Sequence, residues 1–163
     1  MHGAIEVPLP LGENLQTFVV ANADEVADAD QLSTAVIRQN DNMQKPVYIS
    51  EIIGFTSDNS VKSLDVELKR LVGQAVFVPV ESQEEMDGIT QFDALDITFT
   101  NVGVAYSVKE EKAVLEDVTV RTNRESGFGA YVYSFPTENN GSRTSVDVAY
   151  LKEGVIVNRT NGS

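Results

Sequence analysis

The feature that most constrains this chain is its last third, where strand-like segments are separated by turn-forming residues. Residues 128–135 are rich in aromatic and β-branched side chains, which suit a half-buried pleated surface. Residues 144–150 alternate apolar and polar side chains, and residues 155–157 are all β-branched. Proline, asparagine and glycine stand between these segments, at 136–142 and 152–154. The pattern predicts three consecutive antiparallel strands in a meander.

Similar strand signals recur through the rest of the chain. Pro79 has no amide donor, so its strand is expected to end there or to lie at a sheet edge. Turns are expected at residues 101–103 and 109–112. A spacing of roughly 8 to 12 residues between about eight strands is typical of an antiparallel β-sandwich or barrel. The remaining predicted strands cover residues 16–21, 47–55, 75–80, 95–100, 104–108 and 114–120.

Two segments show helical rather than strand periodicity. Residues 61–72 place aliphatic side chains at helical spacing, residues 58–60 precede them with N-cap oxygens, and Gly73 follows as a stop signal. We therefore expect a helix over 61–72, in preference to a strand through 64–68. A weaker helical pattern covers residues 23–39. The buried stripe of the first helix would comprise Leu64, Leu68 and Leu71.

The first 14 residues, here called the N-terminal arm, read as an extended segment. Pro8, Pro10 and Gly12 favour an extended chain over a packed element. Residues 15–163 then form a single β-rich domain, since no repeat or shift in composition divides them. We expect the arm to mediate assembly, and the alternative is an arm folded back on its own domain. Its apolar side chains alternate along the chain: Ile5, Val7, Leu9 and Leu11.

The charge of the chain narrows its range of partners. The 12 Lys and Arg residues against 25 Asp and Glu residues give a net charge of −13, which repels a phosphate backbone. Nucleic acid is therefore not an expected partner. No apolar run approaches the roughly 20 residues that span a bilayer, and no basic and apolar leader begins the chain, so we expect neither a membrane partner nor a visible export signal. Cysteine is absent, which removes disulfides and thiolate chemistry.

The residues that usually carry catalysis are sparse. His2 is the only histidine and lies in the N-terminal arm, so a histidine-dependent triad is excluded. Glycoside cleavage needs only two carboxylates at a suitable separation. An acidic chain contains many such pairs, and solvent-exposed strand faces are a better explanation for them than catalysis. The chain has no tryptophan, so only tyrosines such as Tyr106, Tyr131 and Tyr133 are left to stack on a sugar. The carboxylates considered are Asp93, Asp96, Glu116 and Asp117.

Two acidic clusters are candidate calcium sites, but neither fits the ligand pattern of an EF-hand. Asp24, Asp28 and Asp30 lack the third ligand, the glycine and the distal glutamate of an EF-hand loop. The second cluster lies in residues 81–88, which we expect to form a solvated, metal-free loop. Gly127 and Gly129 lack the spacing and the following helix of a phosphate-binding loop, so no cofactor is expected. The second cluster contains Glu81, Glu84, Glu85 and Asp87.

These observations favour a protein that acts through its surface. The combination of an extended arm and a β domain resembles, in style, the shell, decoration and tail proteins of viruses, tailed phages in particular. We expect a non-enzymatic, self-assembling structural protein located in the virion, whose partners are copies of itself and other structural proteins. The alternatives are a carbohydrate- or protein-binding β-sandwich module, extracellular or cytoplasmic, and a carboxylate-dependent glycoside hydrolase.

Overall fold

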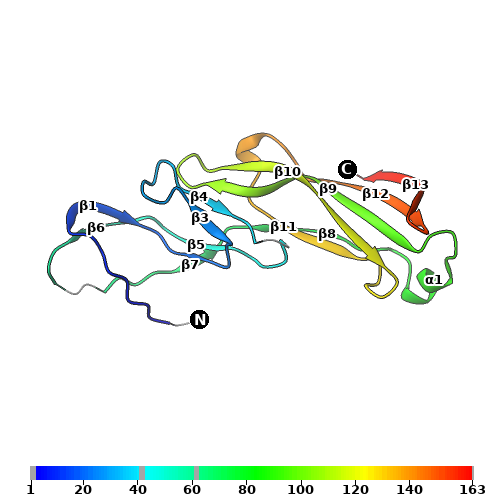
Figure 1. Cartoon of the computed structure of the whole chain (residues 1–163), viewed down its shortest axis with the longest axis horizontal. Helices are drawn as coiled ribbons and strands as arrows, with labels where there is room; N and C mark the ends of the chain where they lie inside the picture. The colour runs from blue at the N-terminus through cyan, green and yellow to red at the C-terminus, as the bar shows by residue number, and fades with distance from the viewer. Residues whose placement is uncertain (1–2, 41–42, 61–62, 163) are drawn as a thin grey trace.

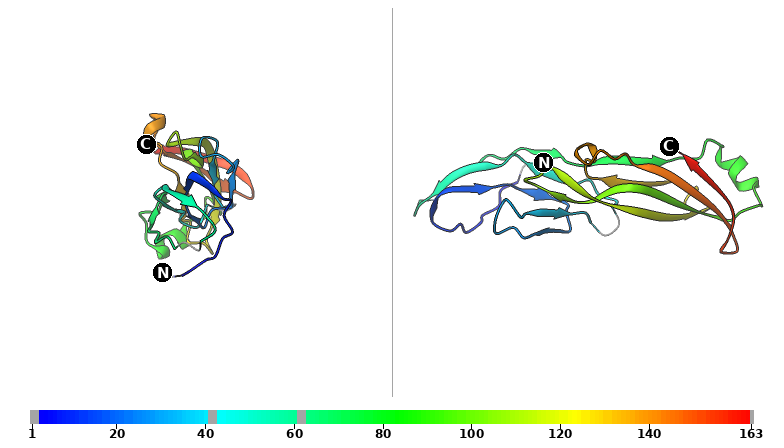
Figure 2. Two further views of the ribbon diagram at one scale, coloured as in Figure 1. Left: turned by 90° about the vertical axis from the view of Figure 1, so that its left-hand side faces the viewer. Right: turned by 90° about the horizontal axis from the view of Figure 1, so that it is seen from above.

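The computed structural model describes residues 3–40, 43–60 and 63–162 and shows an elongated molecule built from antiparallel strands (Figures 1 and 2). The β1–β6 pair lies at one end of the long axis and the short helix α1 (Gln83–Gly88) at the other. The predicted fold class, mainly β with antiparallel sheets, is confirmed, and the arrangement is consistent with a β-sandwich. The strands are β1 (Gly12–Thr17), β2 (Val20–Ala21), β3 (Glu25–Ala27), β4 (Val36–Arg38), β5 (Tyr48–Ser50), β6 (Ile53–Ser57), β7 (Leu68–Arg70), β8 (Gly73–Phe77), β9 (Ala94–Ser107), β10 (Lys112–Asn123), β11 (Ala130–Ser134), β12 (Ser145–Lys152) and β13 (Val155–Gly162).

The main sheet is organised around β9. Along one edge β9 pairs with β10, and along the other edge it pairs first with β12 and then with β4. The outer strands β13 and β3 extend the sheet beyond β12 and β4. Because β9 is long enough to hold two partners end to end, one strand carries both halves of the molecule (Figure 1).

Shorter sheets form the opposite layer, and two core clusters lie between the layers. In this layer β8 pairs with β11, and β5 pairs with β2 and β7. The β1–β6 pair lies at the end of the long axis and adds no residue to either cluster. The second core cluster consists of Ala35, Ile37, Val47, Val72, Tyr106, Val108, Ala113 and Phe135. The first core cluster consists of Met86, Phe92, Leu95, Ile97, Phe99, Val102, Phe128, Ala130, Val132 and Val148.

Gly103 is the point where β9 meets the chain that follows β11. The Phe135 amide donates to the Gly103 carbonyl (3.0 Å), and the Gly103 amide donates to the Ser134 hydroxyl (2.8 Å). A Cβ at position 103 would lie 2.7 Å from the Phe135 carbonyl oxygen. Only glycine therefore permits this approach of the two backbones.

The helix predicted over residues 61–72 is wrong. Residues 61 and 62 lie outside the described part, residues 63–67 have no regular structure, and Leu68–Arg70 is strand β7. Leu64 and Leu68 are exposed, so they form no buried stripe, whereas Val72 is buried. Pairing of β7 with β5 outweighs the helical spacing because local propensity is weak beside tertiary contacts. The Ser60 amide donates to the Asp58 carboxylate (2.8 Å), so these residues form a turn instead of a helix cap.

The helical reading of residues 23–39 is also wrong. These residues form the β3–β4 hairpin, in which Val26 pairs with Ile37. The chain reverses through Asp28, which has a positive φ of 51°. Ile37 is fully buried in the second core cluster, so long-range packing determines the structure of this segment.

Two predicted connections also differ in the structure. Residues 101–103 form no turn, because Asn101, with φ of 53°, makes an irregularity within the continuous strand β9. The final meander is only half correct: β12 and β13 form a hairpin, but β11 pairs with β8 in the other layer. The connection through the 3-10 helix Glu138–Asn140 carries the chain from one layer to the other.

The acidic loop expected at residues 81–88 contains helix α1. Ser82 caps it, since its hydroxyl accepts from the Glu85 amide (3.3 Å) while the Glu85 carboxylate accepts from the Ser82 amide (2.8 Å). The sequence contains the signal for this capping box, a serine followed three residues later by glutamate, although the acidic composition of the segment predicts a loop. Among the described residues, none of the helices has the length and apolar character of a membrane span.

Candidate functional site

The N-terminal arm presents its apolar side chains to solvent. Residues 3–11 are all exposed and have no regular structure, and strand β1 begins at Gly12. Figures 1 and 2 show this segment running away from β1 along the outside of the molecule. No part of the domain therefore buries the alternating side chains. Their exposed fractions are 78% for Ile5, 60% for Val7, 45% for Leu9 and 66% for Leu11.

A second apolar surface lies on the outward face of β8 and β11. Ala75 and Phe77 of β8 pack against the first core cluster, so the alternate side chains of that strand point outward. Val76 is 53% exposed and lies directly opposite Tyr131, which is 37% exposed. We call this surface the β8–β11 face; it comprises Gln74, Val76, Val78 and Tyr131, and it is bordered by Tyr133, which is half-buried and packs against the second core cluster.

The β8–β11 face carries no charge. Residues 71–80 and 126–137, which contain the two strands, include no Asp, Glu, Lys or Arg. The rings of Tyr131 and Tyr133 meet edge to face with centroids 6.0 Å apart, and the Arg70 guanidinium lies 5.0 Å from the Tyr133 centroid at the end of the face. Exposed apolar and aromatic surface without charge is typical of a contact region.

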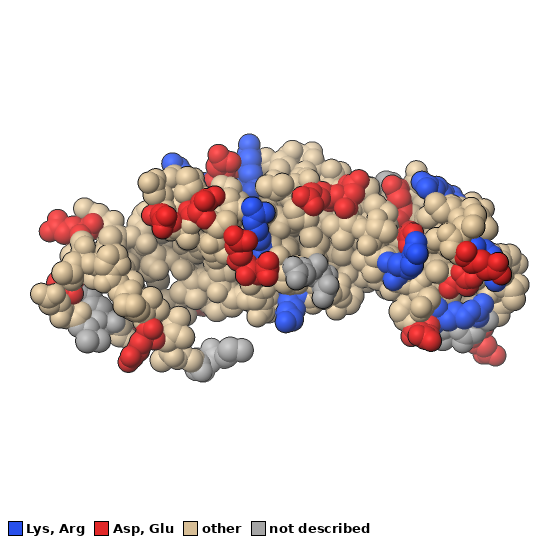
Figure 3. All heavy atoms as spheres, in the orientation of Figure 1, with Lys and Arg blue, Asp and Glu red and all other residues tan. Residues whose placement is uncertain are grey.

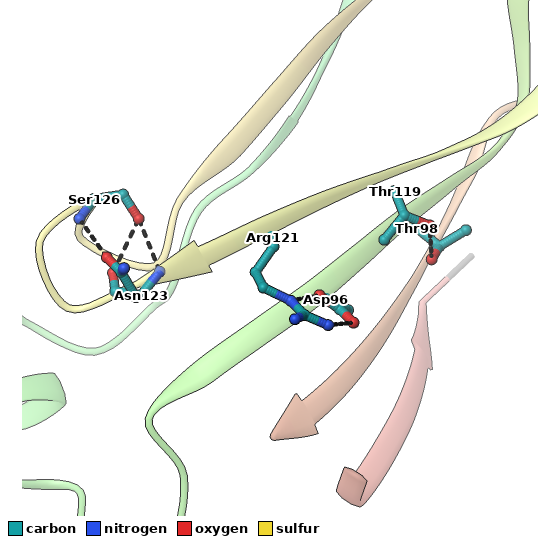
Figure 4. Close-up of polar contacts among 6 residues, drawn as sticks. All are labelled: Asp96, Thr98, Thr119, Arg121, Asn123 and Ser126. Carbon is teal, nitrogen blue, oxygen red and sulfur yellow. Dashed lines mark hydrogen bonds and ion pairs between the residues drawn. The ribbon is translucent and has the colours of Figure 1, made fainter. Parts of the chain in front are cut away.

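The outward face of the main sheet is polar by contrast (Figure 4). The Arg121 guanidinium on β10 donates two hydrogen bonds of 2.6 Å to the Asp96 carboxylate on β9. The hydroxyls of Thr119 and Thr98 share a hydrogen bond of 2.8 Å. These pairs lie directly opposite each other across the two strands. Figure 3 shows charges of both signs spread along the side in view, so the acidic excess forms no single patch there.

The Asp96–Arg121 pair makes part of the stability depend on pH. Hydrogen bonds from the Arg121 guanidinium hold the pKa of Asp96 below its ordinary value, although partial burial opposes this. The folded state therefore releases the proton more readily than the unfolded state, so the stabilisation is complete at neutral pH and is lost as pH falls through the folded pKa.

We expect Asp96→Asn to be less stable than the wild type at pH 7, with a difference that shrinks below about pH 4. The loss should be small because the Arg121 side chain is mostly exposed. Urea unfolding across this pH range measures it. Arg121→Met should behave in the same way, since both substitutions break the same pair. A difference that persists unchanged at low pH would contradict this account.

The free edge of β10 is protected against pairing. The side-chain amide of Asn140 donates to the Ala113 carbonyl (2.7 Å) and its oxygen accepts from the Ala113 amide (3.1 Å), so it occupies the edge as a strand would. Register shifts near Leu115 and Asp117, together with four charged residues, further disfavour pairing along β10. This edge is therefore a poor place for a second chain to add.

Strand β13 is exposed along its whole length. The strand extends beyond the edge of the opposing sheet, because that sheet consists only of β8 and β11. Four of its eight residues are polar, among them the charged Arg159, and Val155, Ile156 and Val157 are exposed apolar side chains. A shallow hollow of about 440 Å³ lies beside it, lined by Gln91, Phe92, Tyr150, Val157 and Asn158.

The carboxylates considered for catalysis hold strands and turns in place. Asp93 accepts from the Glu153 amide (2.9 Å), Asp96 binds Arg121, and Asp117 accepts from the Asn101 amide (3.1 Å). Glu116 lies exposed on β10. These contacts give three of the four acids a structural role. Of the three tyrosines that could stack on a sugar, Tyr106 is buried against Phe135, Tyr133 is half-buried against the second core cluster, and Tyr131 is exposed on the outward face.

The residues weighed as metal or phosphate ligands are dispersed. Asp24, Asp28 and Asp30 lie exposed along the β3–β4 hairpin, and Glu84 and Glu85 belong to the first turn of α1. Across residues 3–40, 43–60 and 63–162, no group of three or more acids or histidines is placed to hold a metal ion. Gly127, with φ of 70°, belongs to the turn before β11. His2 and the side chain of Asp87 lie outside the described residues.

Comparison with known proteins adds no relative: no family model, curated protein or solved structure matches this chain.

Proposed function

We propose that this chain is a self-assembling structural protein, a component of a virion, whose N-terminal arm links one copy to the next. The observation that carries the proposal is the exposure of Ile5, Val7, Leu9 and Leu11 along an arm that its own domain leaves uncovered. Exposed apolar side chains gain free energy by leaving water, and a neighbouring copy supplies the surface that buries them. Arms of this kind link β domains in viral shells and tails.

Magnitudes indicate how the copies associate. Complete burial of four aliphatic side chains would contribute at most about 6 to 12 kcal/mol, while the association of two proteins costs about 4 to 15 kcal/mol. A single donated arm is therefore marginal. Reciprocal exchange of arms, or closure of a ring, multiplies the contacts and favours a symmetric oligomer.

The long-range charge of the chain opposes assembly. Each copy has a net charge of −13, so copies repel one another until salt screens the field. Assembly should therefore strengthen as ionic strength rises, which is the opposite of the salt dependence of a charge-mediated contact. Sedimentation at low and high sodium chloride concentrations measures this directly.

Deletion of residues 1–11 is expected to abolish assembly while leaving the thermal midpoint unchanged at concentrations where the wild type is monomeric. The deletion stops before Gly12, so the β1–β6 pairing is preserved. Light scattering measures the association state and calorimetry measures the midpoint. A lower midpoint with an unchanged association state would instead place the arm in its own core.

Two full-length variants, compared with each other, provide the control for the deletion. Serine at all four apolar arm positions should reproduce the deletion, whereas Ala4→Ser with Glu6→Ser should leave assembly intact, because only the first set removes the apolar face. Electron microscopy of the wild type then tests the virion role, which requires shells, rings or tubes of regular size.

Carbohydrate binding is the second candidate function. The exposed ring of Tyr131, which meets the half-buried ring of Tyr133 edge to face, favours it, since exposed aromatic rings stack on sugars. Under this alternative the wild type remains monomeric, and an oligosaccharide changes its tyrosine fluorescence. The absence of tryptophan makes that signal specific to tyrosine.

A further inference from the structure

The two outward faces of the sandwich differ in charge, so they are not equally suited to contact between copies. Charged pairs such as Asp96–Arg121 cover the main sheet, whereas the β8–β11 face has no charged side chain on either strand. Two copies that each carry a net charge of −13 repel least where the surfaces that meet are uncharged. Among the described residues, β8 pairs only with β11, so its other edge is open to a further strand.

The arm has the chemistry of a strand that pairs on one edge only. In an extended chain the amides of successive residues point to opposite edges, so the amides of every second residue share one edge. Pro8 and Pro10 remove donors from the same edge, while the amides of Ile5, Val7, Leu9 and Leu11 all point to the other. Those four side chains also share one face. An arm bound in this way therefore presents an outer edge that has lost two donors and disfavours addition of a third strand.

Arm and face also match in length and charge. Glu6 is the only charged side chain within residues 3–11, and it alternates with the apolar set, so it points away from their face. The seven residues from Ile5 to Leu11 are sufficient to run along β8 and the exposed Val78 beyond it. By comparison, the edge of β10 is blocked by Asn140, and β13 has exposed apolar side chains only over Val155–Val157 and continues with four polar residues that include the charged Arg159.

We infer that the β8–β11 face and the free edge of β8 receive the N-terminal arm of a second copy. The arm adds as a strand beside β8, with its apolar side chains against Val76 and Tyr131. This inference rests on the proposed function and specifies the surface through which assembly occurs. A second copy is the occupant because residues 3–11 are exposed and without a strand partner in their own chain.

Disulfide trapping tests the inference, since the chain contains no native cysteine. Full-length Val7→Cys is mixed with full-length Val76→Cys under mild oxidation, and linked peptides are identified by mass spectrometry after trypsin digestion. In the control, the Val7→Cys chain is mixed with full-length Val114→Cys in place of Val76→Cys. Val114 lies on β10 and has the same exposed fraction as Val76, 53%. We expect a link between positions 7 and 76 of different copies, and little between 7 and 114.

The outcomes separate this inference from the proposed function. If the wild type assembles and the link to position 76 is absent, or no stronger than the link to 114, the inference is overturned while the proposed function stands. If the wild type stays monomeric, both are overturned. As a second measurement, Val76→Glu should weaken association by about tenfold or more by burying a charge, whereas Val114→Glu leaves it unchanged. Equal weakening by both variants would also overturn the inference.

Discussion

Phe99→Ala is expected to lower the free energy of unfolding by about 3 to 5 kcal/mol, through lost burial and the cavity left behind. Phe99 is fully buried in the first core cluster. It lies on β9 opposite Val118 of β10 and Val146 of β12, both of which pack against that cluster. Removing the ring therefore opens a cavity between the main sheet and the opposite layer. Urea unfolding at a concentration where the protein is monomeric measures the loss.

Phe55→Ala is the matched control for this truncation. Phe55 lies on β6, is partly exposed and belongs to neither core cluster, so the same chemical change should cost much less. Losses of similar size at positions 99 and 55 would mean that the first core cluster does not dominate stability. The control also measures how much the β1–β6 end of the molecule contributes to the free energy of unfolding, and we expect that contribution to be small.

Gly103→Ala is expected to cost about 2 to 4 kcal/mol, a large effect for the addition of one methyl group. The new Cβ would lie 2.7 Å from the Phe135 carbonyl oxygen and 3.0 Å from the Phe135 amide nitrogen. Backbone atoms cannot rotate away as a side chain can, so β9 and the end of β11 must separate. That separation weakens the hydrogen bonds of Gly103 with Ser134 and Phe135.

Gly73→Ala distinguishes this close contact from a general effect of replacing glycine. A Cβ at Gly73, the first residue of β8, would meet no atom within 4 Å. The change should be neutral or slightly stabilising because alanine lowers the entropy of the unfolded chain. If thermal or urea unfolding shows Gly103→Ala to be as benign as Gly73→Ala, the backbones at residues 103 and 135 are not in tight contact. Because Gly103 anchors β11, its replacement should also weaken assembly through the β8–β11 face.

Part of the candidate site could be read from the sequence and part could not. The alternation along the N-terminal arm indicated an apolar edge, and the structure leaves that edge exposed. The β8–β11 face was missed, although the uncharged runs at residues 71–80 and 126–137 were visible as a signal. Neither run indicates alone that the two strands lie side by side, because their pairing joins residues far apart in the chain.

The sequence by itself determined which side chains share a face and where the chain turns. Val146, Val148 and Tyr150 point to the core as predicted, since alternation follows from the covalent geometry of an extended chain. Glu153 and Gly154 have positive φ in the predicted hairpin turn. Only the tertiary structure decided which strands are neighbours. It placed residues 68–70 beside β5 despite their helical spacing and put β11 in the opposite layer from β12. The physical reason is that pairing depends on how much apolar surface distant segments bury together, which no local pattern contains.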